Sequence, residues 1–502
     1  MTAALRISRR SFLSRHESWW AWLAPLAVFV LIGLSPVIGL PKLVAAALGL
    51  AVIVVLSRHP GVALVALVVF LPLQIPVFSV AYKYGVPGQL LELAGSTKEV
   101  LGLAIVVAAA REVFKGRSKL DRLDKLVLAY VGVMLLYLLL PMVVSGSTYP
   151  HSFTGRLLGF RLNAGFLLLF VAARHAPIDQ RWRRRFVAAV IGIAVFFAAL
   201  GVYQYLQPRS FNNFLVDNLG VPFFLLDVFK SPYSEVVQLM RWTISSPVRV
   251  GSLFVGPFNF ADFLLLPAAL LIDRLTRKRA RLRDIAFIGL VGGALFASQT
   301  RANMLAFGVI ALLALSPSPQ RVLANRLRLL AIILLAIAAF LPSLVATRLG
   351  GAGGSSQSTQ GHFDEIRGGI DLLAAHPLGL GLGTAPAVAV RLEGAPIVIS
   401  DNSILQVGNE LGVVMMVLFV VILVAVVLQL GRADRDDPSN ALASSARLAL
   451  IGLLVAGQLH HVFQTFAITW PLWAAVGLAL ARRPTRGDRS LHDHAEDLPV
   501  AG

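Results

Sequence analysis

The sequence contains no cysteine and few charged residues. The absence of cysteine excludes disulfide bonds, thiolate metal sites and cysteine nucleophiles. Charged residues make up 14% of the 502 positions and apolar residues 57%, whereas soluble domains carry about 25% charged residues. The apolar residues occur in repeated blocks of about 15–22 residues with almost no charge, the length needed to cross a hydrocarbon core of about 30 Å. These features exclude a soluble enzyme, a disordered chain and a secreted disulfide-bonded domain.

The apolar blocks predict an all-α, polytopic transmembrane protein with about 14 spans. Helices are expected because backbone polar groups inside a membrane must be hydrogen-bonded within the span itself. We expect the whole chain, 1–502, to form a single integral membrane domain. The predicted spans are 19–40, 43–57, 61–80, 97–112, 126–144, 157–173, 186–205, 251–272, 285–299, 302–316, 329–346, 402–430, 448–463 and 467–481.

Lysine and arginine set the expected orientation, because cytoplasmic loops carry an excess of both. With the N-terminus in the cytoplasm, most of the 45 Lys and Arg residues fall in segments on the inner side. The C-terminal tail, 482–502, is then also cytoplasmic. The formal net charge of +19 is explained by these loops. Nucleic acid is not an expected partner, because the basic residues are distributed among short loops and do not gather on one soluble face.

Two long segments, 206–250 and 347–400, are expected to be external loops that contain short helices. Long loops in a compact protein are usually functional or disordered, and neither segment has a disordered composition. The first contains an apolar run, 221–229, that is too short to span and suits an interfacial or re-entrant helix. We therefore expect the functional face of the protein to be external.

The second long loop has three parts. Residues 350–359 are rich in glycine and serine and predict a flexible lead. Apolar residues then recur at helical spacing and predict one amphipathic helix; they are Phe363, Ile366, Ile370 and Leu373. Three glycines after His376-Pro377 predict a tight turn; they are Gly379, Gly381 and Gly383.

Six arginines are expected on the outer side or near the outer ends of spans, where the positive-inside rule disfavours them. An arginine at bilayer depth costs about 2.5–3.5 kcal/mol, so it usually faces a partner or an aqueous cavity. Arginine also grips phosphate oxygens through two parallel hydrogen bonds, and several converging on one cavity would suit a pyrophosphate. For each one, the alternative is a snorkelling or salt-bridged structural arginine. The six are Arg156, Arg161, Arg241, Arg249, Arg301 and Arg367.

Several acids and histidines are candidates for proton transfer. Asp401 opens the twelfth predicted span, where it is either a helix N-cap or a carboxylate general base. Glu410 in the same span and Asp262 in the eighth are intramembrane acids, which are usually paired or functional. His362 is a second candidate base, with an ordinary loop histidine as the alternative.

No metal site is expected. His460 and His461 are adjacent, so their side chains point to different helix faces. Asp434-Arg-Asp436 matches a triplet that holds a divalent metal in nucleotide-sugar enzymes, but it lies in a short loop with no soluble domain to hold a nucleotide. We also expect no cofactor.

Four segments taken together resemble the O-antigen ligase and O-antigen polymerase superfamily of bacterial surface-polysaccharide enzymes. The resemblance covers 249–412 in order, spacing and expected sidedness, whereas the N-terminal half is similar only in hydropathy. The segments are Arg249 to Phe263, with an arginine, a glycine and Pro257-Phe-Asn259; the turn Ser298-Gln-Thr-Arg301; Gly361-His362 to Gly383, with Arg367 before the glycine turn; and Asp401-Asn402 to Gly412, which includes Glu410.

The resemblance implies an inverting, metal-independent glycosyltransferase in the bacterial cytoplasmic membrane. The implied donor is an oligosaccharide on undecaprenyl pyrophosphate at the outer face, and membrane lipid surrounds it. Arg301 and Arg367 match arginines that bind the pyrophosphate in the family, and Arg249 matches less closely. Asn402 and Glu410 lie in matching positions and are expected to support the site. A chain-length regulator is a further implied partner.

The chain departs from the ligase pattern at one position. Asp401 stands where ligases have the histidine that activates the acceptor hydroxyl. Related enzymes, including peptidoglycan glycosyltransferases of the cell-shape and sporulation group, resemble this chain in having an external carboxylate. Asp401 is therefore the expected base, with His362 as the alternative.

Three functions remain open at this point. The expected one is polymerisation of undecaprenyl-pyrophosphate-linked repeats, favoured over a ligase by the 14 spans and the missing histidine. A ligase would transfer the glycan to a lipid A core or another acceptor. A lipid-linked oligosaccharide flippase would have a similar number of spans, but such transporters show repeated halves with broken spans, and no repeat is present in the sequence.

Overall fold

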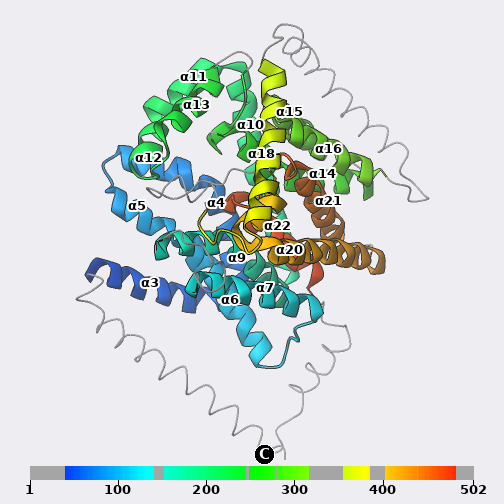
Figure 1. Cartoon of the computed structure of the whole chain (residues 1–502). Coiled ribbons are helices and arrows are strands. Elements are labelled where there is room, and N and C mark those ends of the chain that lie inside the picture. Colours follow the sequence, from blue (N-terminus) through cyan, green and yellow to red (C-terminus); the bar gives the residue numbers. More distant parts are fainter. Residues whose placement is uncertain are drawn as a thin grey trace, which may run out of the picture.

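The computed structural model describes residues 40–140, 152–244, 248–254, 256–277, 281–315, 354–384, 402–437 and 439–481. All regular structure in these ranges is helical, which confirms the all-α prediction for them (Figure 1). The predicted span 19–40 up to residue 39, the predicted span 329–346, the residue Asp401 and the tail 482–502 lie outside the described residues.

The helices of the first half are α3 (Leu40–Leu56), α4 (Pro60–Lys83), α5 (Gly88–Gly95), α6 (Thr97–Phe114), α7 (Arg122–Leu139), α9 (Phe153–His175), α10 (Gln180–Leu206), α11 (Pro208–Asn213), the π-helix η1 (Phe214–Asn218), α12 (Val221–Asp227) and α13 (Tyr233–Ile244). Those of the second half are the short 3-10 helix η2 (Ser252–Phe254), α14 (Pro257–Arg277), α15 (Leu282–Ala297), α16 (Arg301–Ala314), α18 (Gly354–Ala375), α20 (Ser403–Asp436), α21 (Ala441–Ala456) and α22 (Phe466–Leu480).

Five helical stretches of the described chain are long and apolar enough to cross a membrane. They are Pro60–Lys83, Gly88–Phe114, Phe153–His175, Gln180–Leu206 and Ser403–Asp436. Shorter apolar helices include Arg301–Ala314, Ala441–Ala456 and Phe466–Leu480. The chain therefore has the character of an integral membrane protein, while the count of about 14 spans stays a prediction.

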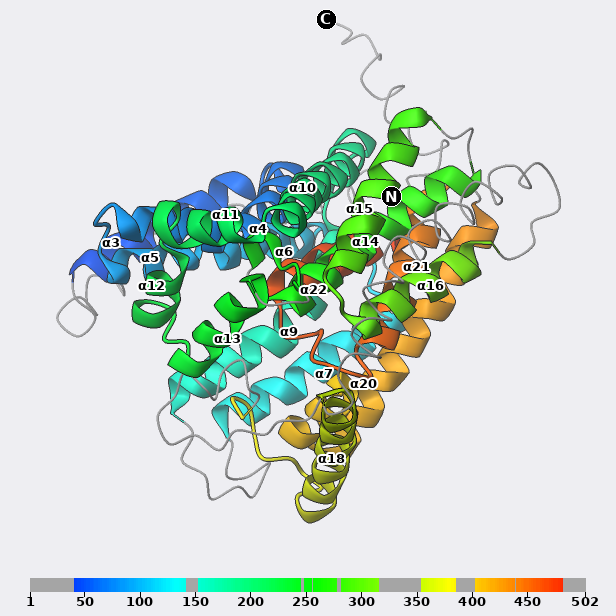
Figure 2. The same cartoon turned by 90° about the horizontal axis from the view of Figure 1, so that it is seen from above.

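Side-chain contacts at the two ends of α9 define two ends of the bundle. The side chain of Arg156 at the start of α9 donates to the Leu138 carbonyl at the end of α7, so α7 and α9 are antiparallel. At its other end, Arg174 donates to the Leu480 carbonyl at the end of α22, so α22 runs parallel to α9. Seen from above, α3, α5, α11 and α12 lie on one side of the molecule and α16 and α21 on the other (Figure 2).

Aromatic rings and glycines pack the centre. The ring of Phe166 on α9 lies 5.3 Å from Trp473 on α22 and 5.9 Å from Phe463, measured between centroids. Trp470 fits between α6 and α9, because a Cβ at Gly102 or Gly165 would lie 2.9 or 2.8 Å from its ring atoms. Larger residues at these two glycines would push the helices apart.

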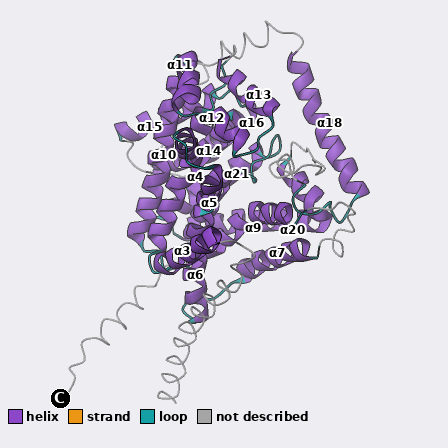
Figure 3. Cartoon of the chain, turned by 90° about the vertical axis from the view of Figure 1, so that its left-hand side faces the viewer, coloured by secondary structure: helices purple, strands orange, loops and turns teal. Residues whose placement is uncertain are grey.

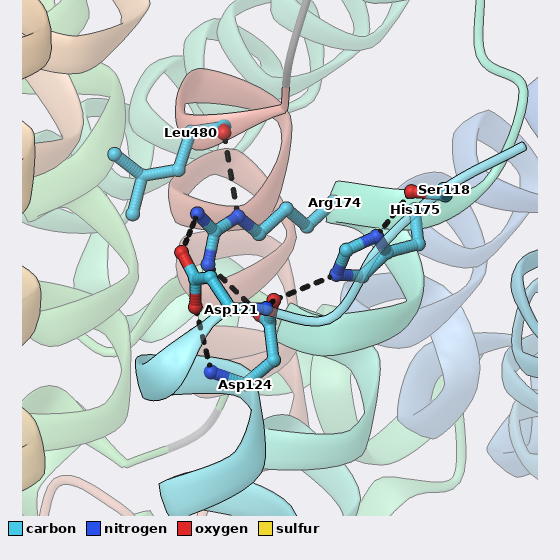
Figure 4. Close-up of polar contacts among 6 residues, drawn as sticks. All are labelled: Ser118, Asp121, Asp124, Arg174, His175 and Leu480. Carbon is cyan, nitrogen blue, oxygen red and sulfur yellow. Dashed lines mark hydrogen bonds and ion pairs between the residues drawn. The ribbon is translucent and has the colours of Figure 1, made fainter. Parts of the chain in front are cut away.

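A closed group of charges ties the ends of α7, α9 and α22 together; we call it the Asp124 cluster, and it comprises Ser118, Asp121, Asp124, Arg174 and His175 (Figure 4). Arg174 donates to the carboxylates of Asp121, at 2.5 Å, and Asp124, at 2.8 Å. His175 Nε2 lies 2.9 Å from Asp124, and its Nδ1 lies 2.6 Å from the Ser118 hydroxyl. Each charged group therefore has an oppositely charged or polar partner.

Three sequence-based boundaries are wrong. The span expected at 251–272 begins as α14 only at Pro257, since proline has no N–H to donate and suits the first helical turn. The span expected at 448–463 is α21, Ala441–Ala456, and the apolar residues after it leave the helix. The flexible lead expected at 350–359 is helical from Gly354 onward, as part of α18.

The two long loops contain helices, as expected. Segment 206–250 holds α11, η1, α12 and α13, and α12 coincides with the predicted short apolar helix. The amphipathic helix expected after residue 360 is part of α18, which stands away from the bundle in Figure 3. Of the predicted apolar stripe, Leu373 is buried, Ile366 is half-buried and Ile370 is 55% exposed.

Candidate functional site

Two chain segments are held together where α15 turns into α16. The Val250 N–H donates to the Ala297 carbonyl at 3.2 Å, and the Gln299 side chain donates to the Val248 carbonyl at 3.2 Å. Gln299 has a φ of 54°, the left-handed region that a tight turn requires. This turn fixes the segment that carries Arg249 beside the first residue of α16, which is Arg301.

Arg249 and Arg301 form an arginine pair. The Arg249 guanidinium lies 4.9 Å from the ring centroid of Trp242 and 4.8 Å from that of Phe258, within the range of cation–π attraction. Burial, and the positive charge of Arg301 nearby, lower the pKa of Arg249 to about 10. Arg249 therefore stays charged at neutral pH, and the two cations repel each other.

The arginine pair has the properties of an anion site. No carboxylate of the described residues forms an ion pair with Arg249, and its Nε is buried without a hydrogen-bond partner. Arg301 is exposed and begins α16, where unpaired N–H groups and the helix dipole favour negative charge. An anion with several oxygens, such as a pyrophosphate, would supply the missing partner of Arg249 and lie close to Arg301.

A buried acid–histidine pair lies next to the arginine pair. Asp262 on α14 accepts from Asn303 Nδ2 at 2.6 Å, and His460 Nε2 lies 3.0 and 2.9 Å from its two carboxylate oxygens. The centroid of the His460 ring lies 5.4 Å from that of the Phe258 ring, which also contacts the Arg249 guanidinium. The buried acid therefore has partners from two other segments of the chain.

The first turn of α20 is fastened to the segment that carries His460. Ser403 donates from its N–H to the Gly457 carbonyl at 2.7 Å and from its hydroxyl to the His460 carbonyl at 2.8 Å. Asn402 caps α20, because its side-chain oxygen accepts from the N–H groups of Ile404 and Leu405. The N-cap alternative considered for Asp401 thus belongs to Asn402, while Asp401 itself lies outside the described residues.

Glu410 supports a turn of the second long loop. Its buried carboxylate accepts from Asn163 Nδ2 at 3.0 Å and from the Gly383 N–H at 3.2 Å. The φ angles of Gly379, Gly381 and Gly383 are +80°, +98° and +96°, so the predicted tight turn is confirmed. At Gly379 a Cβ would lie 2.6 Å from the Glu410 carbonyl oxygen, which makes the close approach of turn and helix specific to glycine.

The structure does not gather all six arginines in one place. Arg161 forms an ion pair with Glu99, which is the structural alternative considered for it. Arg156 donates to the Leu138 carbonyl at 2.6 Å, and Arg241 is exposed on α13. Arg367 is exposed on α18, the helix that stands away from the bundle (Figure 3).

His362 also lies in α18, but its side chain is outside what the structure describes. The only arginines among the six whose proximity is established for the described residues are therefore Arg249 and Arg301.

Sequence reasoning missed His460 and Asn303. Asp262 was suspected because a buried acid requires a partner, but that partner is 198 positions away in sequence. Periodicity reports only local neighbours, and the predicted span 448–463 placed His460 inside a helix. The described residues contain no group of three His, Asp or Glu side chains that could hold a metal ion.

One protein-family model matches a part of the chain that includes part of this site. Residues 286–420 match the family model described as O-Antigen ligase. This match supports the resemblance to the O-antigen polymerase and ligase superfamily over those residues. The matched part contains Arg301, α18 and the start of α20, whereas Arg249 lies before it. No curated protein matches the chain.

The match to this family model supports a membrane enzyme that transfers glycans, with lipid-linked glycans as substrates. The matched region includes the turn before α16 and the glycine turn that Glu410 holds. Both lie inside the matched part, and the Asp262–His460 pair joins residues outside it to Asn303 in the first turn of α16.

Proposed function

We propose that this protein polymerises undecaprenyl-pyrophosphate-linked oligosaccharide repeats at the outer face of the bacterial cytoplasmic membrane. One observation carries the proposal: Arg249 and Arg301 lie together, with no carboxylate of the described residues paired to Arg249. A pyrophosphate leaving group supplies the missing negative charge. Arg367 is assigned to the same group on the family resemblance alone.

The reaction needs a leaving group that departs without protonation by a general acid, and a general base that accepts the proton of the acceptor hydroxyl. The bond between the anomeric carbon and the pyrophosphate oxygen breaks while the acceptor hydroxyl forms a new glycosidic bond on the opposite face. Arg249 and Arg301 stabilise the charge that grows on the leaving pyrophosphate. Asp401, directly before the cap of α20, accepts the proton of the hydroxyl, with His362 as the alternative base.

The orientation follows from the two ends of the bundle. The beginnings of α14 and α16 lie at the arginine pair, and the beginning of α20 is hydrogen-bonded to the segment that carries His460. At the opposite end, Arg277 at the end of α14 contacts Asp434 at the end of α20. We propose that the end of the bundle that holds the arginine pair, here called the arginine end, is external, because the predicted topology places 206–250 and 347–400 outside. Both termini are then cytoplasmic.

The test uses purified protein in nanodiscs with one undecaprenyl-pyrophosphate-linked oligosaccharide and no other acceptor, with products separated by size. A ladder of multiples is expected for a polymerase. Transfer only after a lipid A core or another acceptor is added would identify a ligase instead. Movement of the lipid-linked glycan across the bilayer without any new glycosidic bond would favour a flippase.

The proposed base has its own test. Asp401→Asn is expected to abolish turnover nearly completely while binding of glycan-free undecaprenyl pyrophosphate stays unchanged. His362→Gln is the matched variant and is expected to retain activity. The reverse result would move the base to His362.

A further inference from the structure

Two buried amide side chains on α20 have unused hydrogen-bonding capacity. Gln406 is 2% exposed and Asn409 is 1% exposed. All four of their side-chain nitrogen and oxygen atoms are buried without a hydrogen-bond partner. Other buried amides near the site each make at least one hydrogen bond: Asn303 donates to Asp262 and Asn163 donates to Glu410.

Leaving these amides unpaired opposes folding. Buried polar side chains nearly always have a partner, and an unpaired one loses its hydration without compensation. Methionine or leucine would fill the same space without that cost. The two amides therefore have a hydrogen-bonding capacity that no described part of the protein uses.

The two amides share one side of α20 at the arginine end. Positions 402, 406 and 409 are spaced by four and three residues, which places them on one helix face. Ser403, just before them, is fastened to the segment beside the arginine pair. At the other side of the stretch, the carbonyl of Asn409 accepts from the Leu380 N–H of the glycine turn at 2.8 Å. Gln406 and Asn409 follow Ser403 by about 4.5 and 9 Å along the axis.

The chemistry of an amide selects the ligand. Each amide offers two N–H donors and one carbonyl acceptor. A phosphate group only accepts, so it would leave both amide oxygens unpaired. A sugar hydroxyl donates and accepts at once, and matches an amide on both counts. The arginine pair and the amides thus suit different parts of one lipid-linked glycan.

We propose that Gln406 and Asn409 form a binding site for sugar hydroxyl groups of the lipid-linked glycan, next to the site for its pyrophosphate. This inference rests on the proposed function. It assigns separate parts of the substrate to separate residues. Arg249 and Arg301 bind the pyrophosphate, and the two amides bind the sugar attached to it.

The experiment measures binding of three probes to wild-type protein in nanodiscs: the undecaprenyl-pyrophosphate-linked oligosaccharide, glycan-free undecaprenyl pyrophosphate and the free oligosaccharide. Wild-type protein is expected to bind the first most tightly. Gln406→Met and Asn409→Leu are each expected to weaken it about tenfold, with the affinity for the glycan-free lipid unchanged. Ser445→Ala, which removes a hydroxyl bonded within α21, is the matched control and should change neither affinity.

Thermal stability separates this role from a structural one. Because each substitution removes an unpaired polar group, both variants are expected to have a raised Tm. A raised Tm with unchanged affinity for every probe would mean that only ordered water occupies the site. A lowered Tm with loss of binding of both lipids would mean that the amides have a structural role. Either result overturns the inference.

The remaining outcomes separate the inference from the proposed function. Equal wild-type affinity for the two lipids would overturn the sugar site while leaving the pyrophosphate site intact. No binding of either lipid would overturn both. Weakened binding of the free oligosaccharide in the variants would assign the site to an acceptor glycan, and weakening seen only for the lipid-linked form would assign it to the donor.

Discussion

Charged side chains gather at both ends of the helical bundle, but their charges are matched differently. In the Asp124 cluster, Arg174 lies between two carboxylates, and His175 bonds to one of them and to Ser118 (Figure 4). In the arginine pair, two cations are neighbours, and Arg249 rests on aromatic rings without an ion pair from the described residues.

This difference indicates what each group of charges does. Matched charges complete their hydrogen bonds within the protein, so the Asp124 cluster fixes the relative positions of α7, α9 and α22. Neighbouring like charges repel until an anion binds between them. The first arrangement favours a role in stability, and the second favours ligand binding.

The largest effect is expected from breaking the matched cluster. Asp124 is 0% exposed, so Asp124→Leu leaves Arg174 and His175 short of a buried partner and should cost about 3–5 kcal/mol of stability. The measurement is the thermal unfolding midpoint in detergent. The double variant Asp124→Leu with Arg174→Leu should recover part of the loss, because the buried guanidinium is then gone and only the partly exposed Asp121 has lost its ion pair. Equal losses in the single and double variants would contradict this account.

The arginine pair should respond in the opposite way. Arg301→Ala is expected to lower turnover by about 10²–10³-fold, since it removes one donor to the developing charge. Its stability should change much less than that of Asp124→Leu, because Arg301 is exposed and its removal relieves the repulsion on Arg249. Ladder formation and Tm are measured on the same preparation. Arg209→Ala, an exposed arginine on α11, is the control and should leave both unchanged. A loss of Tm in Arg301→Ala as large as that in Asp124→Leu would contradict the distinction between a stabilising Asp124 cluster and a ligand-binding arginine pair.

Asp262 tests whether the arginine end also contains a structural part. Asp262→Leu removes the acceptor of Asn303 and the partner of His460, and should lower stability by about 1–3 kcal/mol. Because Phe258 contacts both His460 and Arg249, affinity for undecaprenyl pyrophosphate should fall several-fold as well. Asp262→Asn keeps an acceptor oxygen and should lose less of each. Unchanged stability in Asp262→Leu would show that the pair is not structural.

The smallest effect concerns pH at the matched cluster. Burial opposes ionisation of Asp121, but hydrogen bonds from Arg174 and the Asp124 N–H outweigh it and lower its pKa from 3.8. A carboxyl with a lowered folded pKa adds stability above its unfolded pKa of about 3.9 and loses it as the pH falls through the folded value. Asp121→Asn should therefore reduce Tm at pH 7 and narrow the difference between pH 7 and pH 3. The same pH series on wild type and Asp121→Asn checks this, and parallel curves would refute it.

Much of the fold could be predicted from composition and periodicity. Apolar blocks predicted helices, and three glycines after a proline predicted the tight turn at 379–383. Helix ends were less certain, because hydropathy measures apolar content and not backbone conformation. Val462 and Phe463 continue an apolar run after α21 has ended, which is why the span expected at 448–463 was displaced.

The candidate site was predicted in part. Arg249 and Arg301 stood out because arginine is costly near a membrane, and the two lie together. The pairing of Asp262 with His460 joins residues 198 positions apart, and no local pattern carries such a distance. Gln406 and Asn409 gave no signal in the sequence, because their significance comes from burial without partners, which only packing defines.

The break in α20 changes how deep its polar residues need to lie. Gly412 has a φ of +85° and interrupts the helix between Leu411 and Val413. The part from Val413 to Asp436 alone is roughly 36 Å long at about 1.5 Å per residue, enough to cross a hydrocarbon core of about 30 Å. The two turns before the break are not needed for the crossing. They are free to sit at headgroup level, where their side chains are buried within the protein and not among the lipid tails.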